Sequence, residues 1–171
     1  LQLIQESVKP AEGERVLITG ACGSVGRFSV YAAVQAGAQV IAGVRPGQFD
    51  TARALGASDV LAIGEAYAGE PFDHVADAVG GPDVAALCRH VKPGGRIRTV
   101  ATDPIDPAGL PAVPEFFALH ADAEQLASLV SLVATGEIPL SVAKRVPLAQ
   151  AAEAHRLMES GGLGGKLVLV P

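Results

Sequence analysis

The sequence predicts a doubly wound α/β fold, in which helices cover both faces of one mostly parallel sheet. Two observations carry this prediction. Short β-rich segments alternate along the chain with helical segments, and a glycine-rich turn joins the first strand to the first helix. Strands alternating with helices of this size are typical of βαβ units, which build parallel sheets. A length of 171 residues with 49% hydrophobic residues supplies the core that such a sheet needs.

Six strands are expected in this sheet, in the spatial order 3-2-1-4-5-6. They are predicted at residues 15–19, 39–44, 60–63, 73–77, 96–100 and 113–119. Helices follow the first, second and fourth strands, because small and apolar residues recur there at helical spacing and Gly or Pro marks the ends. The first helix is predicted from the glycine turn that ends at Gly26 to Ala36, and the other two at residues 48–55 and 82–90.

Turns and a tail complete the expected fold. Pro93-Gly-Gly95 predicts a turn before the fifth strand, and prolines within residues 101–112 predict a loop after it. A helix is expected at about residues 122–135, followed by a strand–helix–strand tail. The elements of this tail are predicted at residues 141–146, 148–160 and 166–170. Residues 1–137 are therefore assigned to the sheet domain and residues 138–171 to the tail.

Composition excludes several classes of function. The net charge is −5 and Lys and Arg form no cluster, which argues against a nucleic-acid or anionic-membrane surface. No apolar run approaches the roughly 18–20 residues that span a bilayer. Cys22 and Cys88 lie far apart with no His at metal-ligand spacing. We therefore expect no metal site and a reducing, cytoplasmic setting.

The glycine turn carries the strongest functional signal. Gly20, Gly23 and Gly26 follow a strand and open a helix, which is the context of a Rossmann dinucleotide-binding fingerprint. Gly20 permits the tight turn, and Gly23 allows the backbone to approach a pyrophosphate at the helix N-terminus. Gly26 lets the helix pack close to the sheet. A turn without a ligand is the alternative interpretation.

The end of the second strand indicates which nucleotide binds. An NAD site normally has Asp or Glu there for the ribose 2′-OH, but no acid follows Gly43 until Asp50. Arg45 instead offers a cation to a 2′-phosphate, so the sequence predicts NADP(H). The alternative is a solvated surface Arg. The missing acid also argues against an S-adenosylmethionine-dependent methyltransferase.

Almost the whole chain resembles the cofactor-binding part of the medium-chain dehydrogenase/reductase superfamily. The resemblance is to its zinc-free branch of quinone oxidoreductases and enoyl reductases. The matching segments are Lys9-Pro-Ala-Glu-Gly-Glu-Arg-Val-Leu-Ile-Thr-Gly20, the turn through Gly26, Arg53-Ala-Leu-Gly-Ala57, Phe72-Asp-His-Val-Ala-Asp-Ala-Val-Gly-Gly81, Val91-Lys-Pro-Gly-Gly-Arg96 and Gly164-Gly-Lys-Leu-Val-Leu169.

The resemblance implies an NADPH-dependent, zinc-independent enzyme that transfers hydride between NADPH and a small quinone, enone or other activated carbonyl compound. It implies pyrophosphate contacts from the backbone at Gly23, Ser24 and Val25, and nicotinamide-ribose contacts at Ala78, Val79, Ala101 and Thr102. Gln48 stands where relatives often carry Lys near the nucleotide. The family's N-terminal GroES-like domain, to which the tail returns, is expected to supply the catalytic side chains. No catalytic residue is therefore identified, and these 171 residues alone are expected to be inactive.

Several alternatives stay open. A Rossmann domain can be a non-catalytic nucleotide-binding or sensory module, or the enoyl reductase domain of a larger synthase. A short-chain dehydrogenase is excluded because neither Tyr31 nor Tyr67 is followed by Lys four residues later. Cys22 is expected to pack rather than react, and Asp77 is expected to hydrogen-bond backbone at a strand end rather than act as a base.

Assembly is predicted from the sixth strand. Residues 113–119 form an apolar candidate edge strand, on which Phe116 and Phe117 would face opposite sides. A bare apolar edge invites pairing with another chain. In the family such edges meet across a two-fold axis, so a homodimer through this strand is expected. The alternative is that the loop at residues 101–112 covers both phenylalanines.

Overall fold

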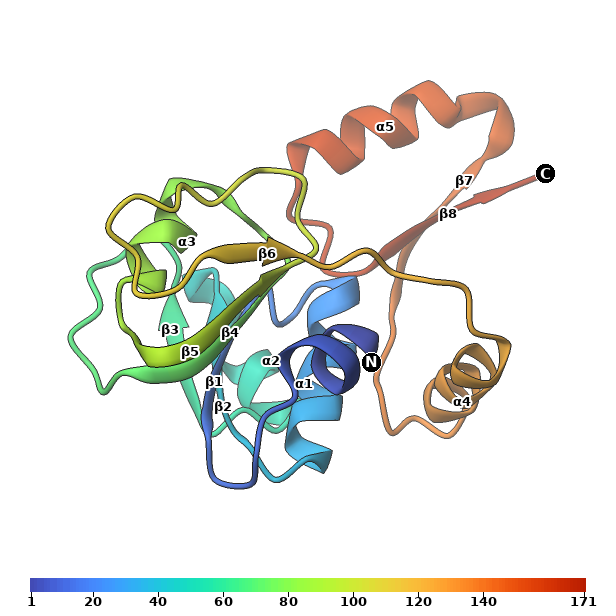
Figure 1. The fold of residues 1–171 in the computed structure, drawn as a ribbon. Coiled ribbons are helices and arrows are strands. Elements are labelled where there is room, and N and C mark those ends of the chain that lie inside the picture. Colours follow the sequence, from blue (N-terminus) through green and yellow to red (C-terminus); the bar gives the residue numbers. More distant parts are fainter. The chain divides into compact units, whose positions relative to one another are not determined.

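The computed structural model describes all 171 residues, which divide into two compact units, Leu1–Asp122 and Ala123–Pro171. The first unit contains a six-stranded sheet in the predicted order 3-2-1-4-5-6, with every neighbouring pair parallel (Figure 1). Its strands are β1 (Arg15–Thr19), β2 (Gln39–Val44), β3 (Asp59–Ala62), β4 (Phe72–Asp77), β5 (Val91–Thr99) and β6 (Pro114–Phe116). The predicted doubly wound α/β fold is confirmed.

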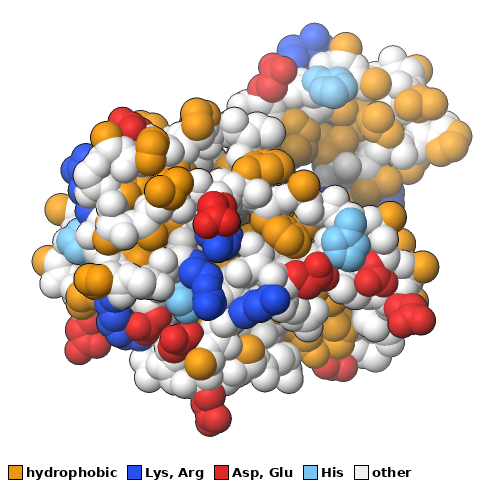
Figure 2. Space-filling model, in the orientation of Figure 1, with side chains coloured by type: hydrophobic (Ala, Val, Ile, Leu, Met, Phe, Trp, Pro, Cys, Tyr) orange, Lys and Arg blue, Asp and Glu red, His pale blue; other side chains and the backbone are white.

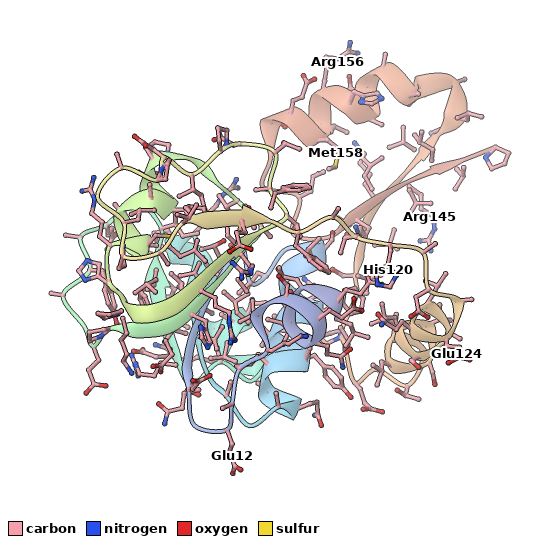
Figure 3. The ribbon with its side chains drawn as sticks, in the orientation of Figure 1. Glu12, His120, Glu124, Arg145, Arg156 and Met158 are labelled. Atoms are coloured by element: carbon pink, nitrogen blue, oxygen red, sulfur yellow. The ribbon has the colours of Figure 1, made fainter.

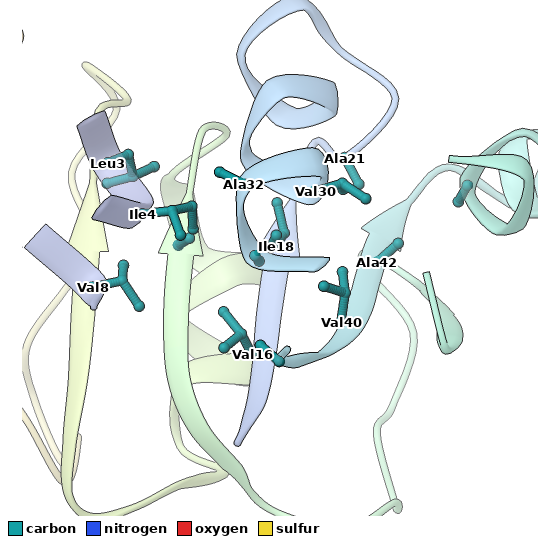
Figure 4. Close-up of a cluster of buried hydrophobic side chains, with 14 of the residues drawn as sticks. Leu3, Ile4, Val8, Val16, Ile18, Ala21, Val30, Ala32, Val40 and Ala42 are labelled. Carbon is teal, nitrogen blue, oxygen red and sulfur yellow. The ribbon is translucent and has the colours of Figure 1, made fainter. Parts of the chain in front are cut away.

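Helical segments cover both faces of this sheet. They are η1 (Leu3–Val8), α1 (Ser24–Gln35), η2 (Pro46–Gln48), α2 (Phe49–Ala54) and α3 (Gly81–Cys88). Side chains from η1, α1 and α2 pack on one face, around Val16 and Ile18 of β1 (Figure 4). Those from α3 pack on the other face, around Leu17. The alternation of β1 between two apolar clusters is what a sheet buried on both sides requires.

The structure corrects the predicted turn at Pro93-Gly-Gly95. These residues lie inside β5, which begins at Val91. Pairing with β4 shifts there, from Phe72 opposite Val91 to His74 opposite Arg96. The turn chemistry is present as an irregularity within the strand, with Gly94 at φ +82°. A local bulge of this kind bends a strand without ending it.

Two other elements differ from prediction. The sixth strand is only three residues long, Pro114–Phe116, because just this stretch pairs with β5. The N-terminal π-helical segment η1 was not predicted. It forms because Leu3, Ile4 and Val8 bury their side chains in the same cluster as α1.

The second unit contains α4 (Ala123–Ala134), β7 (Val142–Pro147), η3 (Leu148–Gln150), α5 (Ala151–Ser160) and β8 (Lys166–Val170). Strands β7 and β8 form a separate two-stranded parallel sheet. The compact units divide after Asp122, and α4 is grouped with the C-terminal elements. None of the helices is long and apolar enough to cross a membrane.

Candidate nucleotide-binding site

The three glycines of the turn after β1 have distinct structural roles. Gly20 has φ +62°, a conformation that L side chains rarely adopt. The Gly23 N–H donates to the Gly20 carbonyl at 2.7 Å and closes the turn. At Gly26 a Cβ atom would lie 2.0 Å from the Gly20 carbonyl oxygen and 2.6 Å from Ala21 Cα. Gly26 is thus needed for the helix to start against the turn.

The start of α1 fits a bound pyrophosphate. Gly23 precedes the helix as its N-cap and provides no side-chain cap, so the first N–H groups are available to a ligand. Gly23, Ser24 and Val25 are exposed, whereas Gly26 is buried. Exposed N–H groups at the positive end of a helix form a ready anion site. The three residues predicted to contact the pyrophosphate therefore lie together at this site.

Arg27 also lies at this turn, and sequence reasoning missed it. Its Nη2 donates to the Cys22 carbonyl at 2.7 Å, and its Nε donates to the Gly23 carbonyl at 3.3 Å. The guanidinium thereby fixes two peptide groups of the loop. A basic residue in the first turn after a glycine fingerprint was the available signal.

Cys22 packs as a neutral thiol. Burial raises its pKa, and the nearby positive charge of Arg27 offsets this effect only in part. Its Sγ–H points to the Gln48 carbonyl at 3.7 Å. This contact agrees with the predicted packing role and places the glycine turn beside the residues after β2.

The residues after β2 present one free cation. Arg45 is exposed, and its guanidinium forms no ion pair. Its backbone N–H donates to Gln48 Oε1 at 3.3 Å, and the Gln48 N–H donates to the Arg45 carbonyl at 2.9 Å. The Gln48 side chain thus closes this turn. Gly43 is buried and accepts from the Ala21 N–H at 3.4 Å, which ties β2 to the glycine turn.

A buried hydrogen-bond network joins the ends of β1, β4 and β5. The Asp77 side chain is fully buried. Its Oδ1 accepts from Thr19 Oγ1 at 2.5 Å and from the N–H groups of Val79 and Gly80, both at 3.0 Å. Its Oδ2 accepts from Thr99 Oγ1 at 2.5 Å. Asp77 hydrogen-bonds backbone as predicted, but its two threonine partners were not foreseen.

The remaining predicted residues follow the same strand ends. The Ala78 N–H donates to Thr19 Oγ1 at 3.0 Å, and the Ala101 N–H donates to Thr99 Oγ1 at 2.9 Å. Val79 is partly exposed, and a Cβ atom on Gly20 would lie 3.0 Å from its Cγ2. Ala78 and Val79 are therefore next to the glycine turn. Thr102 is exposed beyond the end of β5.

Other titratable groups are placed away from this site or are inert. Burial and the charge of Asp77 raise the pKa of Cys88 to about 12. His74 is buried between Glu14 Oε2, at 3.0 Å, and the Arg96 N–H, at 3.1 Å. No group of three or more His, Cys, Asp or Glu side chains could hold a metal ion. Figure 2 shows Lys and Arg interspersed with Asp and Glu on one face, without a continuous basic patch.

The strand order and the glycine turn are those of a Rossmann dinucleotide-binding domain. Comparison with known proteins identifies its family. The family model described as zinc-binding dehydrogenase matches residues 37–169. The chain belongs to this family, and it is a cofactor-binding domain of the medium-chain dehydrogenase/reductase superfamily.

Several proteins are similar over most of the chain. A probable mitochondrial zinc-binding oxidoreductase of Arthroderma benhamiae is 30% identical, over 92% of this chain and 52% of that protein. The polyketide synthase GfsB of Streptomyces halstedii is 32% identical, over 93% of this chain and 3% of that protein. The quinone oxidoreductase structure from Coxiella burnetii superposes with a TM-score of 0.82 at 25% identity, covering 98% of this chain and 56% of that one. The chain thus spans about half or less of these relatives.

Proposed function

We propose that this chain binds NADP(H) as the cofactor-binding part of a zinc-independent reductase. The proposed reaction transfers hydride between NADPH and a quinone, an enone or another activated carbonyl compound. Membership of a dehydrogenase family implies a nicotinamide nucleotide. The similarity to a quinone oxidoreductase supports the substrate class. The choice of NADP(H) rests on one observation, the exposed and unpaired guanidinium of Arg45 after β2.

The chain's own residues would bind and orient this cofactor. The N–H groups at Ser24 and Val25 would hold the pyrophosphate at the start of α1. Arg45 would pair with the 2′-phosphate, and the segments after β4 and β5 would hold the nicotinamide ribose. When bound, the nicotinamide supplies the hydride chemistry. No acid or base among the described residues is assigned to the reaction.

Titration calorimetry tests the cofactor choice. The parent protein should bind NADPH more tightly than NADH. Arg45→Ala should reduce this preference by about 1–3 kcal/mol, the usual size of a charge-assisted hydrogen bond. Arg89→Ala removes an exposed guanidinium beyond the end of α3 and should leave the preference unchanged. Equal affinities of the parent for the two nucleotides would overturn the proposal.

A second candidate is the enoyl reductase domain of a larger synthase. It is favoured by the similarity to the polyketide synthase GfsB and, over 52% of this chain, to the trans-enoyl reductase himH of Aspergillus japonicus at 34% identity. The two candidates differ in the electrophile that accepts hydride. NADPH oxidation with a quinone and with an enoyl thioester, measured on a chain carrying both a cofactor and a substrate domain, distinguishes them.

A further inference from the structure

The Asp77 carboxylate is a buried charge held by dipoles alone. Its four donors are the two threonine hydroxyls and two backbone N–H groups described above, and no Lys or Arg pairs with it. Burying a carboxylate is costly unless hydrogen bonds compensate, and a well-packed apolar group is often at least as stable. A carboxylate at this place in the sheet therefore needs a reason besides packing.

The carboxylate fixes the direction of two hydroxyl groups. An ionised carboxylate can only accept, so Thr19 and Thr99 must each donate to Asp77. Each hydroxyl oxygen is then left to accept, from the N–H of Ala78 and of Ala101 respectively. Asp77 thus orders peptide groups after both β4 and β5, directly or through one threonine.

This ordering decides which backbone atoms face away from Asp77. The N–H groups of Val79 and Gly80 point to Asp77, and all peptide bonds are trans. The carbonyls of Ala78 and Val79 in the same peptide planes therefore point the opposite way. The Ala78 oxygen lies on the side of the glycine turn, 3.8 Å from the position of a Cβ atom on Gly20. The Ala78 carbonyl is thus an acceptor beside the proposed cofactor site.

We propose that Asp77 is a positioning residue for the nicotinamide half of the cofactor. It acts through Thr19, Thr99 and the peptides after β4, whose outward carbonyls are matched to the hydroxyl and amide donors of that half. The residues proposed for the adenosine half, Ser24, Val25 and Arg45, are not among the hydrogen-bond partners of Asp77. This inference rests on the proposed NADP(H) binding, and it predicts that the two halves respond differently to substitution.

The test compares two ligands on the parent and on Thr99 variants. Titration calorimetry gives the affinity for NADPH and for adenosine 2′,5′-bisphosphate, which lacks the nicotinamide half. Thr99→Val keeps the shape but removes the hydroxyl, so NADPH binding should weaken about tenfold. Binding of the bisphosphate should stay within about twofold of the parent. Thr99→Ser keeps the hydroxyl group and should bind NADPH as tightly as the parent does.

Asp77→Asn replaces one of the two acceptor oxygens with an NH2 donor, and it should show the same pattern with a larger loss. The fluorescence lifetime of the nicotinamide in bound NADPH should change in Asp77→Asn and Thr99→Val but not in Thr99→Ser. Asp106→Asn is the matched control, because Asp106 caps an exposed turn in the following loop. If Asp77→Asn does not fold, the two Thr99 variants still decide the question.

Two results would overturn the inference. One is an equal loss of affinity for both ligands in Thr99→Val, which would make the network a general support of the fold. The other is NADPH binding that Thr99→Val and Asp77→Asn leave unchanged. A parent protein that binds neither ligand would instead defeat the proposed function, and the inference with it.

Discussion

Gly23 and Gly26 separate ligand binding from folding within one turn. Gly26→Ala would force a Cβ atom into the Gly20 carbonyl, so it should lower the free energy of unfolding by about 1–3 kcal/mol. At Gly23 a Cβ atom would meet only that carbonyl oxygen, at 3.0 Å, and the backbone is extended there. Gly23→Val should therefore fold but lose NADPH binding, because its side chain fills the pyrophosphate's place.

Chemical denaturation and NADPH titration of both variants check this prediction. A folded Gly23→Val protein with the parent's affinity would show that the pyrophosphate lies elsewhere. A Gly26→Ala protein as stable as the parent would show that the turn can relax, contrary to the close approach in the structure.

At the residue scale, motifs formed by neighbouring residues could be predicted, but side-chain hydrogen bonds between residues far apart in the sequence could not. The glycine triplet is a spacing within seven residues, so the sequence shows it directly. The partners of Asp77 are 58 residues before it, at Thr19, and 22 residues after it, at Thr99. Only the register of three neighbouring strands brings them together. Arg27 was missed for a different reason, since its role depends on the side chain folding back onto two carbonyls.

At the element scale, strands were predictable where β-rich residues stand between clear turn signals. The predicted bounds of β1, β2 and β8 agree with the structure. At β5 the Pro-Gly-Gly segment forms an irregularity in the strand pairing, but the strand continues through it instead of ending in a turn. The segment η1 gave too short an apolar pattern to indicate a helix, and burial against α1 is what defines it.

The segment η1 also forms a pH-dependent contact, between Glu6 and His120. The Gln2 side chain donates to the His120 carbonyl and accepts from its N–H, both at 3.1 Å. Glu6 Oε2 lies 2.8 Å from His120 Nε2. This hydrogen bond and the charge of Glu6 raise the pKa of His120, with a smaller contribution from Asp122. Because folding raises this pKa, the contact stabilises the protein fully below about pH 6.5. The stabilisation is lost as pH rises through the folded value.

Glu6→Gln should therefore lower the pKa of His120 toward its ordinary value, as measured by NMR titration of the ring. The stability difference between parent and variant should shrink from pH 5.5 to pH 8.5. Glu12→Gln is the control, because Glu12 is exposed and lies far from His120 (Figure 3). An unchanged His120 pKa in Glu6→Gln would show that the ion pair does not form in solution.

At the scale of the whole molecule, sheet order was predictable because connection rules leave few topologies for alternating strands and helices. The chain divides into compact units after Asp122. The helical pattern of α4 ends in the sequence at about residue 135, and the structure groups this helix with the residues that follow it. The apolar residues of a helix can be recognised in the sequence, but the element against which they pack cannot.

The edge of the sheet carries the last prediction. Strand β6 is one of the two edge strands of the sheet. Phe116 is 63% exposed, while Phe117 packs on the first apolar cluster. One ring is thus exposed and the other is packed, as expected for side chains on opposite faces of the strand. The loop at residues 101–112 packs Ile105 and Leu110 into the second cluster and leaves Phe116 open. Val113 and Leu119 are also mostly exposed, so the segment from Val113 to Leu119 presents an apolar surface beside unpaired strand backbone.

We propose that two copies of the chain pair through residues 113–119, extending the sheet across a two-fold axis. Light scattering should give a dimer at micromolar concentration. Phe116→Lys should raise the dimer dissociation constant by about tenfold or more, since an edge lysine opposes strand pairing. Leu126→Lys, at an equally exposed apolar residue on α4, should leave it unchanged. A monomeric parent at high micromolar concentration would contradict the proposal. Equal dimerisation of Phe116→Lys and the parent would place the contact on another surface, because a charge at the centre of a paired edge cannot be neutral to its assembly.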